Sequence, residues 1–256
     1  MNLLLTNDDG VDSAGIKVLA DVLSREHNVY VIAPDSNRSA VSSHICMFKN
    51  LELKRIEDNV WACSGYPSDC VCVGLLGNLL QTPIDAVISG INYGPNMGTD
   101  IVYSGTCAAA RQAVLNGVPG IALSVESMDD GCSEKNKFKF SAMAEFALKN
   151  LKTLISLAKT DTPRIFVNVN GASVDAYKGV HLNRGLCVRE YNDAIELSQK
   201  CDASDEYKSE YKPGEQFTEK LDGFDFKSVR DGYVSVTRVY ADPIAAETVD
   251  GIEFKL

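Results

Sequence analysis

Two adjacent carboxylates stand near the start of the chain, in the segment Thr6-Asn7-Asp8-Asp9-Gly10. Like charges this close repel each other, so such a pair is favoured either in a turn that faces water or beside a bound cation. Turn chemistry alone would explain an Asp-Asp-Gly segment. A cation site would need further oxygen donors from other parts of the chain, so those parts decide between the two interpretations.

Further oxygen donors follow two other apolar runs that predict buried strands, residues 28–34 (NVYVIAP) and 85–90 (DAVISG). In an open parallel sheet, the carboxyl ends of the strands share one edge, where ligands bind. Carboxylate, hydroxyl and amide oxygens suit magnesium, manganese or calcium better than zinc. The pattern therefore predicts a site for a hard cation. The donors that follow the three strands are Asp8, Asp9, Asp35, Asn37, Ser39, Asn92 and Asn96.

A phosphate-binding site is predicted beside these donors. The segment Tyr103-Ser104-Gly105-Thr106 directly precedes a predicted helix over 105–117. The first turn of a helix presents free N–H groups and the positive end of the helix dipole, which together favour a phosphate. A cation beside such a site is the arrangement expected for phosphoryl transfer or phosphate-ester hydrolysis.

The spacing of apolar residues predicts an alternation of strands and helices. It starts with a strand at 2–6, a helix at 13–27 capped by Ser13, and the strand at 28–34. It continues with a helix capped by Ser68 that runs through 71–80, and with the strand at 85–90. The helix at 105–117 is closed by Gly117. The remaining predicted elements of this part are a strand at 120–125, a helix at 138–159 and a strand at 164–170. This alternation predicts an α/β fold with a Rossmann-like, doubly wound, mainly parallel sheet.

The pattern changes after residue 175. Residues 179–191 and 232–242 resemble strands or hairpin arms, and the polar, acidic segment 201–216 predicts a solvated loop or a protruding arm. The last residues, 250–256, give no functional signal. We expect a single α/β domain over 1–256, with a core at about 1–175 and C-terminal strands and an arm at about 176–256.

The composition limits the partners of the protein. A chain of 256 residues with a formal net charge of −10 lacks the basic surface that a non-specific nucleic-acid or anionic-membrane binder needs. No apolar run approaches the length of a membrane span, and the N-terminus lacks the charged region of a signal peptide. We therefore expect no nucleic-acid or membrane partner and a cytoplasmic location.

Several blocks of the sequence resemble the signature of the SurE (survival protein E) family of nucleotidases. These blocks, in chain order, are TNDDG at 6–10, NRS at 37–39, PSDCV at 67–71, SGIN and GPN within 89–96, YSGT at 103–106 and VRDGYVSVT at 229–237. The resemblance implies a divalent-metal-dependent phosphatase that releases phosphate from nucleoside 5′-monophosphates. It leaves open whether 3′-nucleotides and short polyphosphates are also hydrolysed. It also implies a Rossmann-like core and a C-terminal arm that assembles a homodimer or homotetramer.

The resemblance also assigns residues. It implies one divalent cation per subunit, Mg²⁺ or Mn²⁺, in a site that Ca²⁺ can also occupy. The implied cation ligands are Asp8, Asp9, Ser39 and Asn92, and the implied phosphate contacts are Asn96, Ser104, Gly105 and Thr106. The implied catalytic residues are Asp8 and Asp9, either of which could hold the attacking water or accept its proton.

One departure from the family concerns the substrate. The family usually has Gly-Thr-Pro where this chain has Gly65-Tyr66-Pro67, so a phenol replaces a small hydroxyl near the site. Tyr66 could stack on a nucleobase or simply pack within its loop. Two other classes of protein would also place acidic residues after the first strand: a receiver-type phospho-acceptor and a non-catalytic protein that binds metal or nucleotide.

Overall fold

The computed structural model of the chain describes residues 1–127, 138–189, 193–199, 206–212 and 222–244. Its α-helices are α1 (Ala14–Leu23), α2 (Pro67–Leu76), α3 (Gly105–Leu115), α4 (Ser141–Leu157) and α5 (Asp225–Arg230), with a 3-10 helix η1 at Gly98–Val102. Its strands are β1 (Asn2–Thr6), β2 (Asn28–Pro34), β3 (Leu53–Glu57), β4 (Val60–Cys63), β5 (Ala86–Tyr93), β6 (Gly120–Glu126), β7 (Ile165–Ala172), β8 (Val180–Asn183), β9 (Ala194–Gln199), β10 (Tyr207–Lys212) and β11 (Val234–Tyr240).

The described residues form one nine-stranded sheet in the order β3-β4-β2-β1-β5-β6-β7-β11-β8. The six strands from β4 to β7 in this order run parallel, β3 and β11 are antiparallel to their neighbours β4 and β7, and β8 is parallel to β11. The predicted α/β fold with a mainly parallel sheet is thereby confirmed. Strand order reverses at β1, which pairs with β2 on one side and with β5 on the other. Such a switch point is where doubly wound sheets bind ligands.

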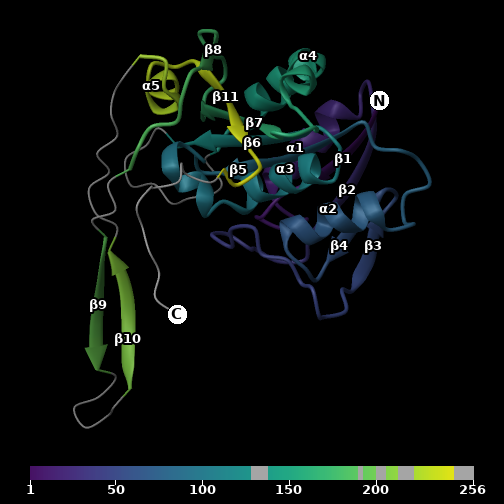
Figure 1. Cartoon of the computed structure of the whole chain (residues 1–256), viewed down its shortest axis with the longest axis horizontal. Helices are drawn as coiled ribbons and strands as arrows, with labels where there is room; N and C mark the ends of the chain where they lie inside the picture. Colours follow the sequence, from purple (N-terminus) through teal and green to yellow (C-terminus); the bar gives the residue numbers. More distant parts are fainter. Residues whose placement is uncertain (128–137, 190–192, 200–205, 213–221, 245–256) are drawn as a thin grey trace, which may run out of the picture.

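Strand β1 shows why both faces of the sheet are covered. Successive side chains of a strand point to opposite faces, and Leu3, Leu4 and Leu5 are all fully buried. Leu3 and Leu5 belong to the apolar cluster that contains the buried residues of α1 and α4. Leu4 belongs to a cluster that contains some of the buried residues of α2 and α3. The central strands therefore lie between two helical layers (Figure 1).

The start of α2 differs from the prediction. The helix begins at Pro67 after Tyr66, and not with Ser68 as its cap; Ser68 lies in the first turn and is buried. The Tyr66 N–H donates to Asp69 Oδ2 (2.9 Å), so the side chain of Asp69 stabilises this end of the helix. Proline is well suited to the first helical position because it lacks the N–H that would have no partner there.

The C-terminal part combines predicted and unpredicted elements. Strand β11 matches the predicted strand at 232–242, whereas among residues 179–189, the described part of the segment 179–191, only Val180–Asn183 is a strand. Part of the predicted loop or arm at 201–216 is β10, which pairs with β9 in an antiparallel hairpin that stands away from the large sheet (Figure 1). The segment 250–256 lies outside the described residues. Within the described residues, no helix is both long and apolar enough to cross a membrane.

Candidate active site

Asp8 lies just past the end of β1 and is 4% exposed. Its carboxylate accepts hydrogen bonds from the hydroxyl of Thr106 (Oγ1 to Oδ1, 2.7 Å) and from the Thr106 N–H (N to Oδ2, 3.3 Å). Thr106 lies in the first turn of α3, so the positive end of the helix dipole faces this carboxylate. The first turn can approach so closely because Gly105 has no side chain: a Cβ there would lie 2.8 Å from Asp8 Cβ.

The electrostatics of Asp8 favour a cation. Burial raises the pKa of the Asp8 carboxyl above its ordinary value, although the hydrogen bonds from Thr106 oppose the rise. Among the residues that the structure describes, no lysine, arginine or histidine forms an ion pair with Asp8. A buried carboxylate is costly unless an opposite charge compensates it. The donor set at this edge therefore fits a divalent cation.

Asp9 is tied to the end of β5. Its Oδ2 accepts a hydrogen bond from the Tyr93 N–H (3.2 Å), and Tyr93 directly follows Asn92. The amide nitrogen of Asn92 donates to the carbonyl oxygen of Gly94 (2.9 Å), which orients the amide and reserves its oxygen for other partners. Asn92 is 8% exposed, so this oxygen belongs to a largely enclosed side chain.

The loop that follows β2 is tied to Asp8. The Arg38 N–H donates to the carbonyl oxygen of Asp8 (2.6 Å), and the next residue, Ser39, is exposed. The Ser39 N–H in turn donates to Asn37 Oδ1 (2.9 Å). Residues adjacent to Ser39 and Asn92 thus bond directly to the acidic pair. The structure brings Asp8, Asp9, Ser39 and Asn92 to one edge of the sheet, and their role as cation ligands stays a prediction.

A cation at this edge of the sheet would be bound jointly by hydroxyl, carboxylate and amide oxygens. Within the described part of the chain, no group of three or more His, Cys, Asp or Glu side chains is placed to hold a metal ion. A site built only from these residue types, as in structural zinc centres, therefore does not occur there. Mixed oxygen donors of the kind gathered around Asp8 are those that magnesium and manganese prefer.

The predicted phosphate contacts at the start of α3 have partners of their own. Ser104 is the N-cap of α3, and its Oγ accepts a hydrogen bond from the Cys107 N–H (3.0 Å). The hydroxyl and the N–H of Thr106 both donate hydrogen bonds to the Asp8 carboxylate. Gly105 provides the close approach between the helix and Asp8. The structure thus shows Thr106 orienting Asp8, and its contact with phosphate stays a prediction, as do those of Ser104 and Gly105.

Asn96 is held by a buried network that sequence reasoning missed. Asn170 on β7 accepts from the Asn96 N–H (2.8 Å) and donates to the Asn96 carbonyl oxygen (3.0 Å), to which Asn168 also donates (2.8 Å). The side chain of Asn96 donates to Ser124 Oγ (2.8 Å), and its predicted phosphate contact stays a prediction. A signal for the network exists in the sequence: Asn168 and Asn170 are polar residues at alternate positions of an otherwise apolar strand.

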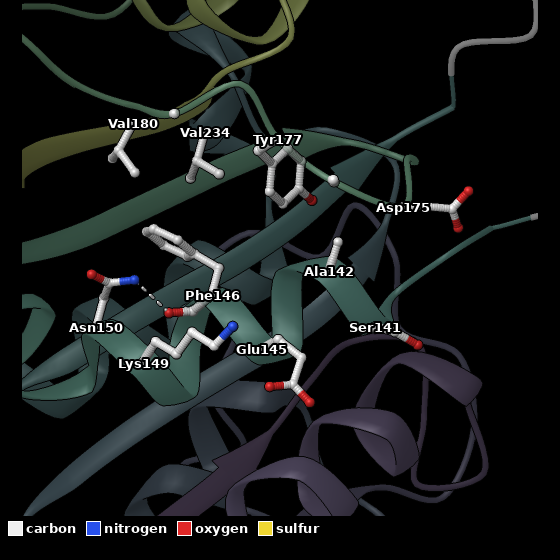
Figure 2. Close-up of a pocket in the computed structure, with 12 residues that line it drawn as sticks. Ser141, Ala142, Glu145, Phe146, Lys149, Asn150, Asp175, Tyr177, Val180 and Val234 are labelled. Atoms are coloured by element: carbon white, nitrogen blue, oxygen red, sulfur yellow. Dashed lines mark hydrogen bonds between the residues drawn. The ribbon is translucent and has the colours of Figure 1, made fainter.

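A cavity lies away from these residues. It is a cavity of about 430 Å³ between α4 and the segment that follows β7. Figure 2 shows Phe146 of α4 and Tyr177 of that segment on opposite sides of it. None of the predicted catalytic, cation-binding or phosphate-binding residues lines this cavity.

Comparison with known proteins agrees with this geometry. The sequence model of one family, described as Survival protein SurE, matches residues 3–192. A 5′-nucleotidase SurE from Treponema pallidum is 44% identical over 183 residues, covering 69% of this chain and 93% of that protein. Another from Synechococcus is 36% identical over 263 residues, covering 99% and 96%. The crystal structure of the SurE protein from Aquifex aeolicus has a TM-score of 0.75 at 30% identity and covers 94% of each chain. The protein therefore belongs to the SurE family.

Proposed function

We propose that the protein is a divalent-metal-dependent phosphatase that hydrolyses nucleoside 5′-monophosphates to the nucleoside and phosphate. The observation that carries the metal dependence is the environment of Asp8. This carboxylate is buried, has no cationic partner among the described residues, and is held at the start of α3 beside Asp9 and the residues next to Ser39 and Asn92. A divalent cation would compensate its charge.

The assignment of the chain to the 5′-nucleotidases rests on its family. The relatives that match this chain are named 5′-nucleotidases, and one of them aligns with 99% of the chain. The chain is an enzyme of this class. We further propose Mg²⁺ or Mn²⁺ as the cation, in a site that Ca²⁺ can also occupy. Hydrolysis of 3′-nucleotides and short polyphosphates remains a prediction to test, as does the cytoplasmic location.

Each residue of the site has a role in this proposal. Asp8, Asp9, Ser39 and Asn92 would hold the cation, which supplies charge neutralisation and a more acidic bound water. Thr106 fixes the orientation of the Asp8 carboxylate through two hydrogen bonds. The asparagine network on β7 fixes the backbone of Asn96 beside the site. Ser104 and Gly105 would bring the start of α3 to the phosphate oxygens, where N–H groups stabilise the negative charge.

A panel of substrates and metals tests the proposal. Metal-stripped protein is expected to release phosphate from 5′-AMP at least about 100-fold more slowly than protein supplied with Mn²⁺ or Mg²⁺, because the cation stabilises the transition state by several kcal/mol. The measurement is inorganic phosphate released from 5′-AMP, 3′-AMP and tripolyphosphate, with and without EDTA. Addition of excess Mn²⁺ after EDTA is the control.

Two outcomes would contradict the proposal. Full activity that persists in EDTA would remove the metal from the mechanism. Stable labelling of the protein by acetyl phosphate, without turnover of 5′-AMP, would indicate a phospho-acceptor in place of a phosphatase.

We also propose that the β9–β10 hairpin joins subunits into a homodimer or homotetramer. Its strand register places Ile195, Leu197, Tyr207 and Tyr211 on one face, and each of these side chains is more than half exposed. Solvent-exposed apolar surface of this kind is typical of an interface.

The hairpin proposal predicts a change of mass in solution. The molecular mass of the wild-type protein in solution is expected to be a multiple of 27.8 kDa, the mass of one chain. In Leu197→Lys the measured mass is expected to fall towards that of one chain, because the interface would have to bury the new charge. Ser198→Lys, on the opposite face of the same strand, is the matched control and should keep the assembly. Light scattering that gives a monomeric wild type would overturn the proposal.

A further inference from the structure

A cavity of about 370 Å³ adjoins the candidate active site. It falls within the range of roughly 300–1,000 Å³ that is usual for small-molecule sites. Arg38 lines it, and the backbone N–H of Arg38 is bonded to Asp8. Tyr66 also lines it, and the next residue, Pro67, contacts the start of α3, because a Cβ on Gly105 would lie 3.2 Å from Pro67 Cγ. Two contacts therefore place the lining of the cavity close to the predicted cation and phosphate positions.

The charge of the cavity suits an anionic ligand. Arg38 and Lys49 line it, and none of the described residues in its lining is acidic, although Arg38 pairs with Asp35 (3.2 Å), which lies outside the lining. This is notable in a chain with a formal net charge of −10. A lining without carboxylates does not repel the phosphate of a nucleoside monophosphate that is bound beside the cavity.

Two neighbouring aromatic rings belong to the lining of the cavity. The rings of Tyr66 and His44 lie 4.0 Å apart between centroids, with an interplanar angle of 52°. The guanidinium carbon of Arg38 lies 5.3 Å from the centroid of the Tyr66 ring. Aromatic rings with a neighbouring cation form the stacking surfaces on which proteins bind nucleobases.

The rim of the cavity carries apolar side chains that have little contact with the protein. Phe48 is 96% exposed and Met47 is 74% exposed, and both line the cavity. Exposed apolar side chains grouped at a cavity indicate a surface that a ligand covers. Phe48 can supply such a cover without any contribution to the core.

We propose that this cavity holds the nucleoside part of the substrate, with the base stacked on Tyr66 and covered by Phe48. The inference rests on the proposed function. In it, Tyr66 and Phe48 determine the selectivity for nucleotides over simple phosphate esters.

The test compares a substrate with a base and one without. In Tyr66→Ala, kcat/KM for 5′-AMP is expected to fall about 5- to 100-fold, the range set by base–aromatic stacking, while that for glycerol 2-phosphate stays unchanged. Tyr66→Phe keeps the ring and is expected to retain both activities. The N–H of residue 66 continues to bond to Asp69 in both variants, so the start of α2 is preserved.

A second variant avoids any question of folding. Phe48→Ala alters a side chain that is 96% exposed and is expected to lower kcat/KM for 5′-AMP several-fold without an effect on glycerol 2-phosphate. Tyr240→Ala, which removes a 54% exposed aromatic ring on β11, is the matched control for both substrates. A change of elution volume in Phe48→Ala with unaltered selectivity would assign the exposed ring to a subunit interface, against the proposal.

Binding of adenosine separates this inference from the proposed function. Adenosine has no phosphate, so calorimetry in EDTA reports on the cavity without the cation. Wild-type protein is expected to bind it and Tyr66→Ala to lose that binding. Adenosine binding in a protein that hydrolyses no ester would leave the cavity assignment standing and overturn the phosphatase. Hydrolysis of 5′-AMP that Tyr66→Ala reduces to the same extent as glycerol 2-phosphate would overturn the cavity assignment alone.

Discussion

Asp8→Asn is expected to slow the hydrolysis of 5′-AMP by about 1,000-fold or more, which corresponds to about 4 kcal/mol of lost transition-state stabilisation. Asparagine has the shape of aspartate and can still accept a hydrogen bond from Thr106, whose hydroxyl can also turn to accept one from the new amide. The substitution therefore removes the charge and leaves the packing unchanged. Measurement of kcat with saturating Mn²⁺ checks the result.

The stability of this variant gives a second measurement. Burial of a carboxylate without a cation costs free energy, so the metal-free variant is expected to unfold at a temperature equal to or above that of the metal-free wild type. Mn²⁺ is expected to raise the unfolding temperature of the wild type, because it binds the folded state, and to leave that of Asp8→Asn unchanged. Asp12→Asn, at an exposed carboxylate that pairs with Lys17, is the matched control.

Thr106→Val tests a smaller change at the same carboxylate, because it removes one hydrogen bond to Asp8 and keeps the charge. It removes the hydroxyl bond of 2.7 Å and keeps the N–H of Thr106. We expect kcat to fall by about 10- to 100-fold, since a hydrogen bond to a charged group is worth roughly 1.5–3 kcal/mol. Near wild-type turnover in both Asp8→Asn and Thr106→Val would show that the chemistry occurs elsewhere.

Gly15→Ala is expected to destabilise the protein by about 1–3 kcal/mol or more, the cost of overpacking a close contact. A Cβ on Gly15 would lie 1.9 Å from the carbonyl oxygen of Ile91, a backbone atom of β5 that cannot move without the strand. Glycine to alanine inside a helix ordinarily stabilises by about 1 kcal/mol, so the sign of the effect is diagnostic. Urea denaturation measures it.

The same substitution is expected to lower activity. The end of β5 carries Asn92 and Tyr93, and the Tyr93 hydroxyl accepts a hydrogen bond from the Ala14 N–H at the start of α1 (3.3 Å). A helix pushed away from Ile91 would therefore displace a predicted cation ligand. Lys17→Ala, at an exposed position of the same helix, is the control and should alter neither property. A more stable Gly15→Ala protein would contradict the close contact.

Local patterns were sufficient to predict the central part of the fold. The apolar run of β1 was predicted with its observed ends, Asn2–Thr6, and Gly117 does follow α3 with a positive φ of 82°. Strand β3 was not predicted because its sequence, LKRIE, is exposed along its whole length and lacks an apolar face. It is defined by its pairing with β4, and a contact between segments is not visible in the pattern of one segment.

The candidate site was likewise predictable from the sequence only in part. That polar residues lie at or just past the ends of β1, β2 and β5 was visible in the sequence, although β5 extends to Tyr93 and so includes Asn92, beyond the predicted end at residue 90. The bonds from Thr106 to Asp8 join residues 98 positions apart, and they depend on how closely α3 approaches β1. That distance is set by Gly105 and by the packing of the whole layer. Sequence reasoning therefore assigned Thr106 to phosphate alone and gave no role to Asn168 or Asn170.

The position of β1 has a consequence for how this protein can change. Asp8 follows a strand that is paired on both sides and covered on both faces, so a large-to-small substitution in the strand would destabilise the fold. The rim of the 370 Å³ cavity comes instead from an irregular segment between β2 and β3 that contributes nothing to the core at Phe48. In the proposals made here, reactivity and substrate preference are carried by separate parts of one chain, so substitutions can change the second while the first stays fixed.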